Sequence, residues 1–503
     1  MAPATLLGLL ASNPAEQTAV ILPELGIRIS YGALRHQVEA VAEALASFGI
    51  GRGDRVGIAL PNGLPAIVAL IGASVAGTAA PLNPAYREDE FRFFLEDIAA
   101  RVLLLPPDGE DEARRAASRL VPVLTIEMDA SGTVRVSDGQ CGSRAIDTDV
   151  DVDDVALVLH TSGSTGRPKR VALSHADLLI SAGNIARTYL LTSRDVSLCV
   201  MPLFHVHGLV ASALAAFASG GTVVVPARFS PPSFWRVVRD HGVTWYSASP
   251  TLHQLLLART RTGSASPTGA ETLRFIRSCS AWLPPQVMHD LEAAFGVPVL
   301  EAYGMTEAAH QISSNPLPPE TRLPGSVGRG TDVRISVMDA DGRHLPTGER
   351  GEVVIQGANV IRGYENSPDA DATSFVDGWF RTGDQGVLDA SGRLTLVGRL
   401  KDLINRGGEK VSPREIDEVL LAHPAIAEAV CFGVPHATWG EEVAALVVLR
   451  ETATESDLLA HCEARLADFK RPKRIHITDV IPRTATGKIQ RCVVAQAYAP
   501  KAL

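Results

Sequence analysis

The sequence predicts an α/β protein with a large N-terminal domain of mostly parallel sheets and flanking helices, a small β-rich subdomain, and a small α+β C-terminal domain. Three observations predict this fold class. Short β-branched runs alternate with alanine- and leucine-rich stretches over roughly the first 300 residues, which is typical of parallel sheets. From about Val333 short strands alternate with turn signals, and roughly the last hundred residues mix strand and helix patterns.

The length of 503 residues exceeds what one hydrophobic core usually supports, so at least two domains are expected. The change of pattern places the boundary near Leu400, with an N-terminal domain over residues 1–400 and a C-terminal domain over residues 401–503. The chain shows no internal repeat and no low-complexity segment, which argues against a solenoid or a disordered scaffold.

The N-terminal domain is expected to contain a series of short buried strands: Arg55–Leu60, Val102–Leu105, Val155–Leu159, Leu198–Met201, Thr222–Val225, Val243–Ser247, Leu273–Ile276 and Val297–Leu300. In parallel sheets ligands bind at the carboxyl ends of strands, so polar motifs that follow strands mark candidate sites. Further along, Gly351–Gly357 and Gly392–Val397 are expected as strands, and Pro413–His423 as a helix with Ser412 at its N-cap.

Composition excludes several function classes. A net charge of -9 argues against a nucleic-acid partner, which would normally leave a basic footprint. The six cysteines are scattered without a C-x-x-C pair, so neither a zinc site nor a disulfide framework is indicated, and a cytoplasmic location is expected. The uncharged stretches Pro61–Tyr86 and Val206–Pro226 are interrupted by Gly, Pro, Ser or His and predict buried structure rather than a membrane span. Residues Met1–Gln17 lack the cationic start of a signal peptide.

The most informative motif is the loop that follows the strand Val155–Leu159. Between Thr161 and Arg170 it combines hydroxyls, glycines and cations, which is the composition of a loop that holds a polyphosphate. It is not the usual P-loop, because Pro168 stands where that motif needs its second glycine. Taken alone, the stretch also fits an ordinary surface loop rich in Ser, Thr and Gly.

Four further clusters follow in order: Glu301–Glu307 after an expected strand, Trp379–Asp384, Gly398–Lys410 and Pro482–Arg491. A carboxylate at a strand end beside a phosphate loop suits Mg²⁺, and an aspartate on a glycine turn suits ribose hydroxyls. Each cluster alone has an ordinary explanation, such as strand-end packing or a turn-forming Asp.

All five motifs in this order and at these separations resemble the adenylate-forming acyl-CoA synthetases, a superfamily that also includes firefly luciferase and the adenylation domains of peptide synthetases. The resemblance covers nearly the whole chain. It implies a mobile C-terminal domain and two half-reactions in one cleft. A carboxylate first attacks the α-phosphate of MgATP to give an acyl-adenylate and pyrophosphate, and the thiol of coenzyme A then displaces AMP.

The resemblance also implies roles for individual residues. The β- and γ-phosphates of ATP are expected at Thr161, Ser162, Gly163, Ser164, Thr165, Gly166 and Lys169, with phosphate and Mg²⁺ at Thr306 and Glu307. Adenine is expected near Tyr303 and the ribose at Asp384 and Arg399; Lys488 is expected to bridge the reacting carboxylate and the α-phosphate. Lys401 falls at the hinge position, and Gly407 and Gly408 at the pantetheine tunnel. Arg170 departs from the pattern, since many relatives have glycine there.

The acid substrate has to be inferred from the acyl pocket. His207, Ser280 and His310 replace the small or apolar side chains of fatty-acid-activating relatives, and donors in a closed pocket suit a second carboxylate. The stretches around them resemble plant and fungal oxalate–CoA ligases, so oxalate is the expected substrate. His205 is common across the wider family and is expected to shape the cleft wall.

Alternatives remain open at this point. Malonate–CoA ligases carry a segment similar to Phe204–Gly208, so His207 alone does not exclude malonate or another short or medium-chain acid. A luciferase-type monooxygenase would need room for a large aromatic substrate. An adenylation module of a peptide synthetase would normally be followed by a carrier domain, for which no room follows Lys488. The sequence is compatible with a monomer or a homodimer.

Overall fold

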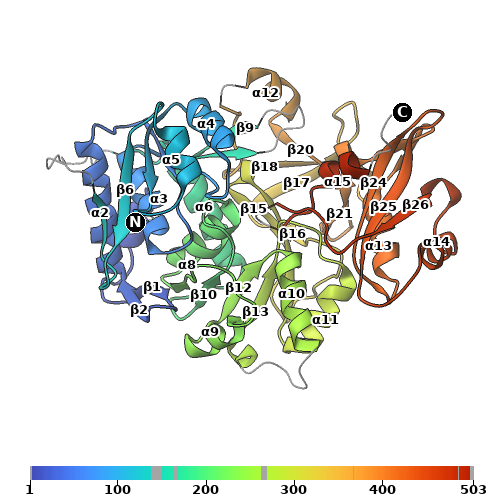
Figure 1. Cartoon of the computed structure of the whole chain (residues 1–503), viewed down its shortest axis with the longest axis horizontal. Helices are drawn as coiled ribbons and strands as arrows, with labels where there is room; N and C mark the ends of the chain where they lie inside the picture. Colours follow the sequence, from blue (N-terminus) through green and yellow to red (C-terminus); the bar gives the residue numbers. More distant parts are fainter. Residues whose placement is uncertain are drawn as a thin grey trace. The chain divides into compact units, whose positions relative to one another are not determined.

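The computed structural model describes residues 3–137, 150–161, 168–261, 269–365, 367–484 and 487–498 (Figure 1). The chain forms two compact units. The first comprises Met1–Leu323, Gly330–Arg334 and Gln356–Thr373, and the second comprises Pro324–Arg329, Ile335–Ile355 and Ser374–Leu503.

The first unit contains a mainly parallel sheet with the order β7-β6-β5-β3-β4-β8-β9. Its strands are β3 (Arg55–Ile58), β4 (Thr78–Pro81), β5 (Ala100–Leu105), β6 (Val123–Met128), β7 (Val134–Ser137), β8 (Val155–Thr161) and β9 (Lys169–Ser174). The helices of this region are α2 (Tyr31–Ser47), α3 (Leu64–Ala76), α4 (Glu88–Asp97) and α5 (Asp111–Ala117). Helix α3 is apolar on all sides and almost wholly buried, and it packs against α2 and β6 (Figure 1).

A second sheet of the first unit has the order β15-β14-β13-β12-β10-β11-β1-β2. Its strands are β1 (Thr18–Leu22), β2 (Ile27–Ser30), β10 (Val196–Cys199), β11 (Thr222–Val224), β12 (Trp245–Ala248), β13 (Phe275–Ser278), β14 (Val299–Met305) and β15 (His310–Ser314). The six neighbouring strands β14, β13, β12, β10, β11 and β1 run parallel, whereas β15 is antiparallel to β14 and β2 is antiparallel to β1.

Helices of this second sheet region are α1 (Leu6–Ala11), α6 (His175–Thr188), α7 (Val206–Gly208), α8 (Ala215–Ala218), α9 (Phe234–Asp240), α10 (Pro250–Arg261) and α11 (Pro285–Phe295). Between α7 and α8 the chain forms a π-helix over Leu209–Leu214. The core of this region combines residues from several strands with α9, α10 and α11, including Tyr246, Ile276 and Leu291.

The second unit contains two antiparallel-rich sheets. One is formed by β17 (Val333–Met338), β18 (Arg350–Gly357), β19 (Phe375–Val376), β20 (Trp379–Leu388) and β21 (Leu394–Arg399). The other is formed by β22 (Ile404–Arg406), β23 (Glu409–Val411), β24 (Ile426–His436), β25 (Gly440–Leu449) and β26 (Arg474–Ile477). Helices α13 (Pro413–Leu421) and α14 (Glu455–Glu463) pack on one face of the β24–β25 pair, and α15 (Arg491–Tyr498) on the other.

The predicted α/β class is confirmed, and every strand expected in the N-terminal part is present within a few residues of its predicted bounds. One helix end differs, because α13 ends at Leu421 rather than His423. Ser412 is the N-cap residue as predicted, but its hydroxyl donates to the carbonyl of Val397 and accepts no hydrogen bond from the helix backbone. The boundary at residue 400 stays a prediction. The strands β19 to β21 belong to the second compact unit.

None of the helices in the described ranges is both long and apolar enough to cross a membrane. The five cysteines within those ranges are free thiols, four of them buried, and Cys141 lies outside the described residues. The cytoplasmic location expected from the cysteine pattern stays a prediction.

Candidate active site

The ends of the phosphate loop are held by a β-hairpin. Strands β8 and β9 pair antiparallel, so that Thr161 lies opposite Lys169 at the point where the loop leaves the sheet. The loop residues Ser162, Gly163, Ser164, Thr165 and Gly166 lie outside the described residues. What the structure describes is therefore the base of the predicted loop, where Thr161 and Lys169 are paired residues of the two strands.

Glu307 lies beside this base, in a short 3-10 turn over Thr306–Ala308. Its side chain is largely buried, and its Oε1 accepts hydrogen bonds from the Tyr364 hydroxyl at 2.9 Å and from Thr161 Oγ1 at 3.4 Å. The Lys169 ammonium lies 4.4 Å from the centre of the Tyr364 ring. The predicted phosphate and metal residues Thr161, Lys169 and Glu307 are thus brought together by a tyrosine that the sequence reasoning had missed.

One expectation about this region was wrong in detail. The cluster Glu301–Glu307 was predicted to follow a strand that ends at Leu300, but β14 continues to Met305, and Tyr303 is a buried residue of the strand. The strand is longer because it pairs with β15, which reverses direction after Ala309. Only Thr306 and Glu307 lie beyond the strand end.

The chemistry of this donor set fits Mg²⁺. No group of three or more metal-ligating side chains occurs in the part of the chain that the structure describes. A single carboxylate beside phosphate-binding groups is what Mg²⁺ usually takes from a protein, since it retains waters and takes other ligands from phosphate oxygens. The role of Glu307 as the metal ligand stays a prediction.

Arg170, the departure from the family pattern, is largely buried and well paired. Its guanidinium donates to the carbonyl of Asp97 at 2.7 Å and lies 3.4 Å from the Asp97 carboxylate and 3.6 Å from Glu365. His160 also contacts the Asp97 carboxylate, at 3.0 Å. The arginine thus connects the start of β9 to the end of α4.

The predicted acyl-pocket residues form one hydrogen-bonded cluster. His207 Nδ1 lies 2.7 Å from Ser280 Oγ, and His207 Nε2 lies 2.7 Å from Ser247 Oγ. The rings of His207 and His310 stack with their centres 5.2 Å apart. His207, His310 and Ser247 are buried, whereas Ser280 is half-buried. His205 lies next to the cluster and accepts the backbone N–H of His207, as a residue that shapes the wall would.

The backbone is strained at two of these residues. Ser280 has φ of 73° and His310 has φ of 107°, both in the left-handed region that non-glycine residues rarely adopt. The carbonyl of His310 comes so close to Gly304 that a Cβ there would lie 1.8 Å from its oxygen. Gly304 is thus required for the approach of β15 to β14, and this approach places His310 beside His207.

Both histidines are neutral at ordinary pH. Burial, with the neighbouring Arg277 guanidinium as the next cause, holds the pKa of His207 and of His310 well below the usual value. The two histidines therefore offer this pocket hydrogen-bonding groups but no positive charge. The permanent cation is Arg277, which is completely buried in β13 and which the sequence reasoning did not single out. Its signal was available as an arginine inside the apolar run Phe275–Ser278.

In the second unit, Asp384 and Arg399 are paired across β20 and β21, with Arg399 Nε 2.8 Å from Asp384 Oδ1. The prediction of a glycine turn before Asp384 was wrong, because Gly383 lies inside the long strand β20, at an irregularity in its pairing with β18. Asp384 is buried and Arg399 is half-buried.

Lys488 is electrostatically coupled to this pair. Repulsion by Arg399, together with burial, lowers the pKa of Lys488 to about 8, against the opposing effects of Asp384 and Asp402. Because the side chain reaches solvent, we attribute the lowered pKa mainly to the repulsion. The predicted ribose residues and the predicted catalytic lysine thus lie within reach of one another's charges.

The predicted hinge and tunnel residues also belong to the second unit. Lys401 is exposed in a 3-10 turn over Leu400–Asp402. Gly407 and Gly408 form the tight turn between β22 and β23, with φ of 59° and 92°, values that favour glycine at both positions. A Cβ on Gly407 would lie 2.8 Å from the ring of Trp439.

A separate cavity of about 450 Å³ lies in the first unit, at the ends of β1, β3, β5 and β6. None of the predicted site residues lines it. Asn62 on its wall bonds the backbone of Met201 and Leu203, the segment that leads to His205 and His207.

Known proteins resemble this chain over nearly its whole length. Residues 10–365 match the AMP-binding enzyme family, and residues 415–488 match the AMP-binding enzyme C-terminal domain. The chain is 45% identical to the oxalate–CoA ligase of Arabidopsis thaliana over 94% of each chain, and 41% identical to that of Saccharomyces cerevisiae over 96% of this chain and 95% of the relative. It is also 38% identical to the sulfoacetate–CoA ligase of Cupriavidus necator, over 97% of this chain and 96% of the relative.

Among solved structures, the ATP-bound crystal structure of MatB from Rhodopseudomonas palustris superposes with a TM-score of 0.89 at 31% identity, covering 99% of both chains. The family resemblance inferred from the motifs is confirmed. The chain belongs to the AMP-binding enzyme family, the adenylate-forming acyl-CoA synthetases.

Proposed function

We propose that this protein is an ATP-dependent, AMP-forming ligase that joins oxalate to coenzyme A. One carboxylate of the acid attacks the α-phosphate of ATP. The bond between the α-phosphorus and the oxygen that bridges to the β-phosphate breaks, and pyrophosphate leaves. The CoA thiol then attacks the acyl carbon of the adenylate, AMP leaves, and the thiol proton is released to solvent. In the first step one anion attacks another, and in the second step the anion AMP leaves. Charge neutralisation and positioning therefore contribute more to catalysis than a covalent intermediate with the protein would.

The residues present suit these roles. Thr161, Lys169 and the loop between them would hold the β- and γ-phosphates, and Thr306 and Glu307 would hold phosphate and Mg²⁺. When bound, the metal supplies positive charge to the phosphate oxygens. Tyr303 would lie near adenine.

In the second unit, Asp384 and Arg399 would bind the ribose, and Lys488 would contact the reacting carboxylate and the α-phosphate. Its proximity to Arg399 supports a position close to the nucleotide. Rotation at Lys401 would exchange Lys488 for the Gly407–Gly408 turn beside the CoA thiol.

The observation that carries the choice of acid is the cluster of His207, Ser280 and His310. Within the described residues, His207 has a partner at each ring nitrogen, whereas the hydroxyl proton of Ser280 and the second ring nitrogen of His310 have none. An aliphatic tail would leave these two groups unsatisfied, which costs free energy, whereas a second carboxylate can accept hydrogen bonds from both. The similarity to oxalate–CoA ligases supports oxalate among the short dianions. A second candidate is sulfoacetate, favoured by the relative with that specificity and by the fact that a sulfonate is also an acceptor-only anion.

The deciding assay is CoA-dependent release of AMP from ATP by the purified enzyme with Mg²⁺, using oxalate, sulfoacetate, malonate, acetate and octanoate in parallel. A preference for oxalate is the expected result. Preference for sulfoacetate or malonate would retain the dianion pocket with a different substrate, and preference for octanoate would show that the cluster does not face the acid. Absence of activity with every acid would contradict the ligase assignment.

His310→Ala tests the pocket directly. It should lower kcat/KM for oxalate by about tenfold or more, because a bond to a charged group is lost, while the affinity for ATP stays nearly unchanged. His175→Ala is the matched control, since His175 is equally buried but bonds the backbone of Leu6 and Ser74. Equal loss of ATP binding and oxalate activation in His310→Ala would make His310 a structural residue.

A further inference from the structure

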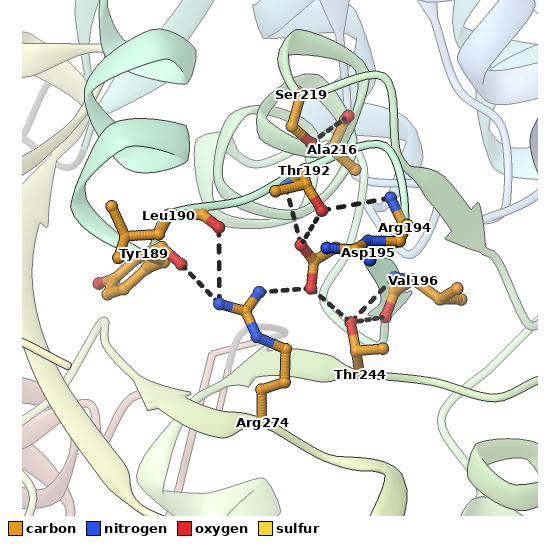
Figure 2. A network of polar contacts seen from close by, with 10 residues as sticks. All are labelled: Tyr189, Leu190, Thr192, Arg194, Asp195, Val196, Ala216, Ser219, Thr244 and Arg274. Carbon is orange, nitrogen blue, oxygen red and sulfur yellow. Dashed lines mark hydrogen bonds and ion pairs between the residues drawn. The ribbon is translucent and has the colours of Figure 1, made fainter. Parts of the chain in front are cut away.

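Two arginines three residues apart at β13 have opposite electrostatic surroundings. Arg274 is paired with a carboxylate: Figure 2 shows its guanidinium directed at Asp195 and, on its other side, at the carbonyls of Tyr189 and Leu190. Asp195 also accepts bonds from Thr192 and Thr244. Arg274 thus has a complete structural role just before the start of β13.

Arg277 has only neutral partners. Its Nε donates to the Tyr189 hydroxyl at 2.9 Å, its Nη1 to Ser247 Oγ at 2.9 Å, and its Nη2 to His310 Nε2 and Gln311 Oε1, each at 3.0 Å. Within the described ranges no carboxylate comes within ion-pair distance of this guanidinium, although its residue is completely buried. A buried cation without a counter-ion is costly and is expected to meet its anion in a ligand.

The contact with His310 fixes where that ring carries its proton. A guanidinium can only donate, so His310 Nε2 must be the acceptor, and the proton of the neutral ring must be on Nδ1. No described residue makes a hydrogen bond to Nδ1. His310 therefore holds one N–H donor in reserve for a ligand.

The contact with Ser247 fixes His207 in the same way. Ser247 Oγ accepts from Arg277, and the only described acceptor for its own hydroxyl proton is His207 Nε2. His207 then carries its proton on Nδ1 and donates to Ser280 Oγ. The Ser280 hydroxyl proton is left without an acceptor in the described residues, and Ser280 is the half-buried member of the cluster. The cluster thus has two arms of hydrogen bonds that start at Arg277. One runs through Ser247 and His207 to Ser280, the other runs to His310, and each ends in a donor.

We propose that Arg277 is the positioning residue that determines the acid specificity of this site, by fixing both arms of the cluster as hydrogen-bond donors toward a second anionic group of the substrate. The inference rests on the proposed function and adds the residue responsible for its selectivity. Histidine and serine each can donate or accept, so the cluster without Arg277 would accommodate either kind of group. With Arg277, the ends at Ser280 Oγ–H and His310 Nδ1–H match a carboxylate, and the guanidinium supplies long-range attraction for its charge.

This arrangement discriminates between close analogues of oxalate. Oxamate has an amide in place of one carboxylate, so it presents an N–H₂ group that donors cannot satisfy, and it lacks one negative charge. Wild-type enzyme should thus prefer oxalate strongly over oxamate. Exchange of Arg277 for a neutral residue should reduce that preference, because the protons of His207 and His310 can then move to the other ring nitrogen.

The experiment begins with wild-type enzyme, oxalate, oxamate and acetate, measured by CoA-dependent AMP release. If wild-type enzyme does not prefer oxalate to acetate, the proposed function fails, whatever Arg277 does. Arg277→Gln is then compared with Arg274→Gln, the matched control from the same segment. Arg277→Gln should lower kcat/KM for oxalate about 30-fold, chiefly through KM. The ratio of kcat/KM for oxamate to kcat/KM for oxalate, called the oxamate-to-oxalate ratio below, should rise about tenfold. The affinity for ATP, measured by calorimetry, should stay unchanged.

Arg274→Gln should leave that ratio within about twofold of wild type, since Arg274 bonds Asp195 and two backbone carbonyls and makes no hydrogen bond to His207, Ser247, Ser280 or His310. Arg277→Lys should recover part of the oxalate activity, because it restores the charge. A parallel loss of oxalate activity, oxamate activity and ATP affinity in Arg277→Gln, or an unchanged ratio, would overturn the proposal.

If Arg277→Gln does not fold, Ser247→Ala and Ser247→Thr replace it. Ser247→Ala interrupts only the arm through His207, and Ser247→Thr keeps the hydroxyl. The proposal is supported if the oxamate-to-oxalate ratio rises in Ser247→Ala but not in Ser247→Thr. It is contradicted if the ratio in both variants equals that of wild type.

Discussion

The hydroxyl of Tyr364 donates a 2.9 Å hydrogen bond to Oε1 of Glu307, and the same tyrosine ring lies 4.4 Å from the ammonium of Lys169. Tyr364 thus orients the carboxylate that would hold Mg²⁺ and supports the lysine that would hold phosphate. Both contacts are lost or weakened if the side chain is altered, which makes Tyr364 a positioning residue for Glu307 and Lys169.

Tyr364→Phe should lower the rate of adenylation about tenfold and raise the Mg²⁺ concentration needed for half-maximal rate, because a bond to a charged group is removed while the ring stays in place. Pyrophosphate release at varied Mg²⁺ measures both effects. Tyr31→Phe is the control, since Tyr31 is a buried tyrosine whose hydroxyl bonds the carbonyl of Gly221. It should lose stability without a change in Mg²⁺ dependence. Identical kinetics in Tyr364→Phe and wild type would show that Glu307 needs no orientation.

Lys488→Ala should separate the two half-reactions. Adenylation should fall by about 10²- to 10³-fold, because a positive charge at the reacting oxygens is lost. Thioester formation from acyl-adenylate supplied to the enzyme should change little, because the lysine is not expected at the site in that step. Stopped-flow measurement of pyrophosphate release and of thioester formation checks each half. Equal loss in both would place Lys488 in the second half-reaction as well.

The pH dependence of adenylation should report the lowered pKa of Lys488. The lysine acts in its protonated form, and its pKa of about 8 means that it loses this proton as pH rises through 8. The kcat/KM for oxalate should therefore fall above pH 8, toward about a tenfold loss per pH unit, since kcat/KM reports the free enzyme. Lys488→Arg stays charged over this range and should show no such decline, whatever its absolute rate. If kcat/KM of Lys488→Arg falls with the same midpoint pH as wild type, the decline belongs to another titrating group.

Arg274→Gln should destabilise the first unit without an effect on acid specificity. The Asp195 carboxylate is buried and loses its cation, although Thr192 and Thr244 still donate to it (Figure 2). Because the Arg274 side chain is 38% exposed, the cost is discounted to about 1–2 kcal/mol of unfolding free energy. Denaturant unfolding measures it. A loss of oxalate preference in this variant would show that the two arginines are coupled.

Much of the fold followed from sequence patterns because those patterns are local. Alternating runs of β-branched and alanine-rich residues predict strands and helices one at a time, and the strands Val155–Thr161 and Thr222–Val224 appear where their apolar residues predicted them. Motif order identified the family, since five separate segments each carry the residue types that bind a nucleotide. The ends of elements were less predictable, because the extension of β14 to Met305 depends on pairing with β15.

The sequence by itself determined the fold class, the family and the residues Thr161, Lys169, Glu307, Asp384 and Lys488 as candidates. Only the tertiary structure decided which side chains act together. Tyr364 reaches Glu307, and Arg277 reaches His310 and Ser247, across separations in the chain that no local pattern records. The physical reason is that hydrogen-bond direction and burial depend on neighbours from other strands. Those neighbours fix His207 and His310 as neutral donors and leave Arg277 as the cation of the site.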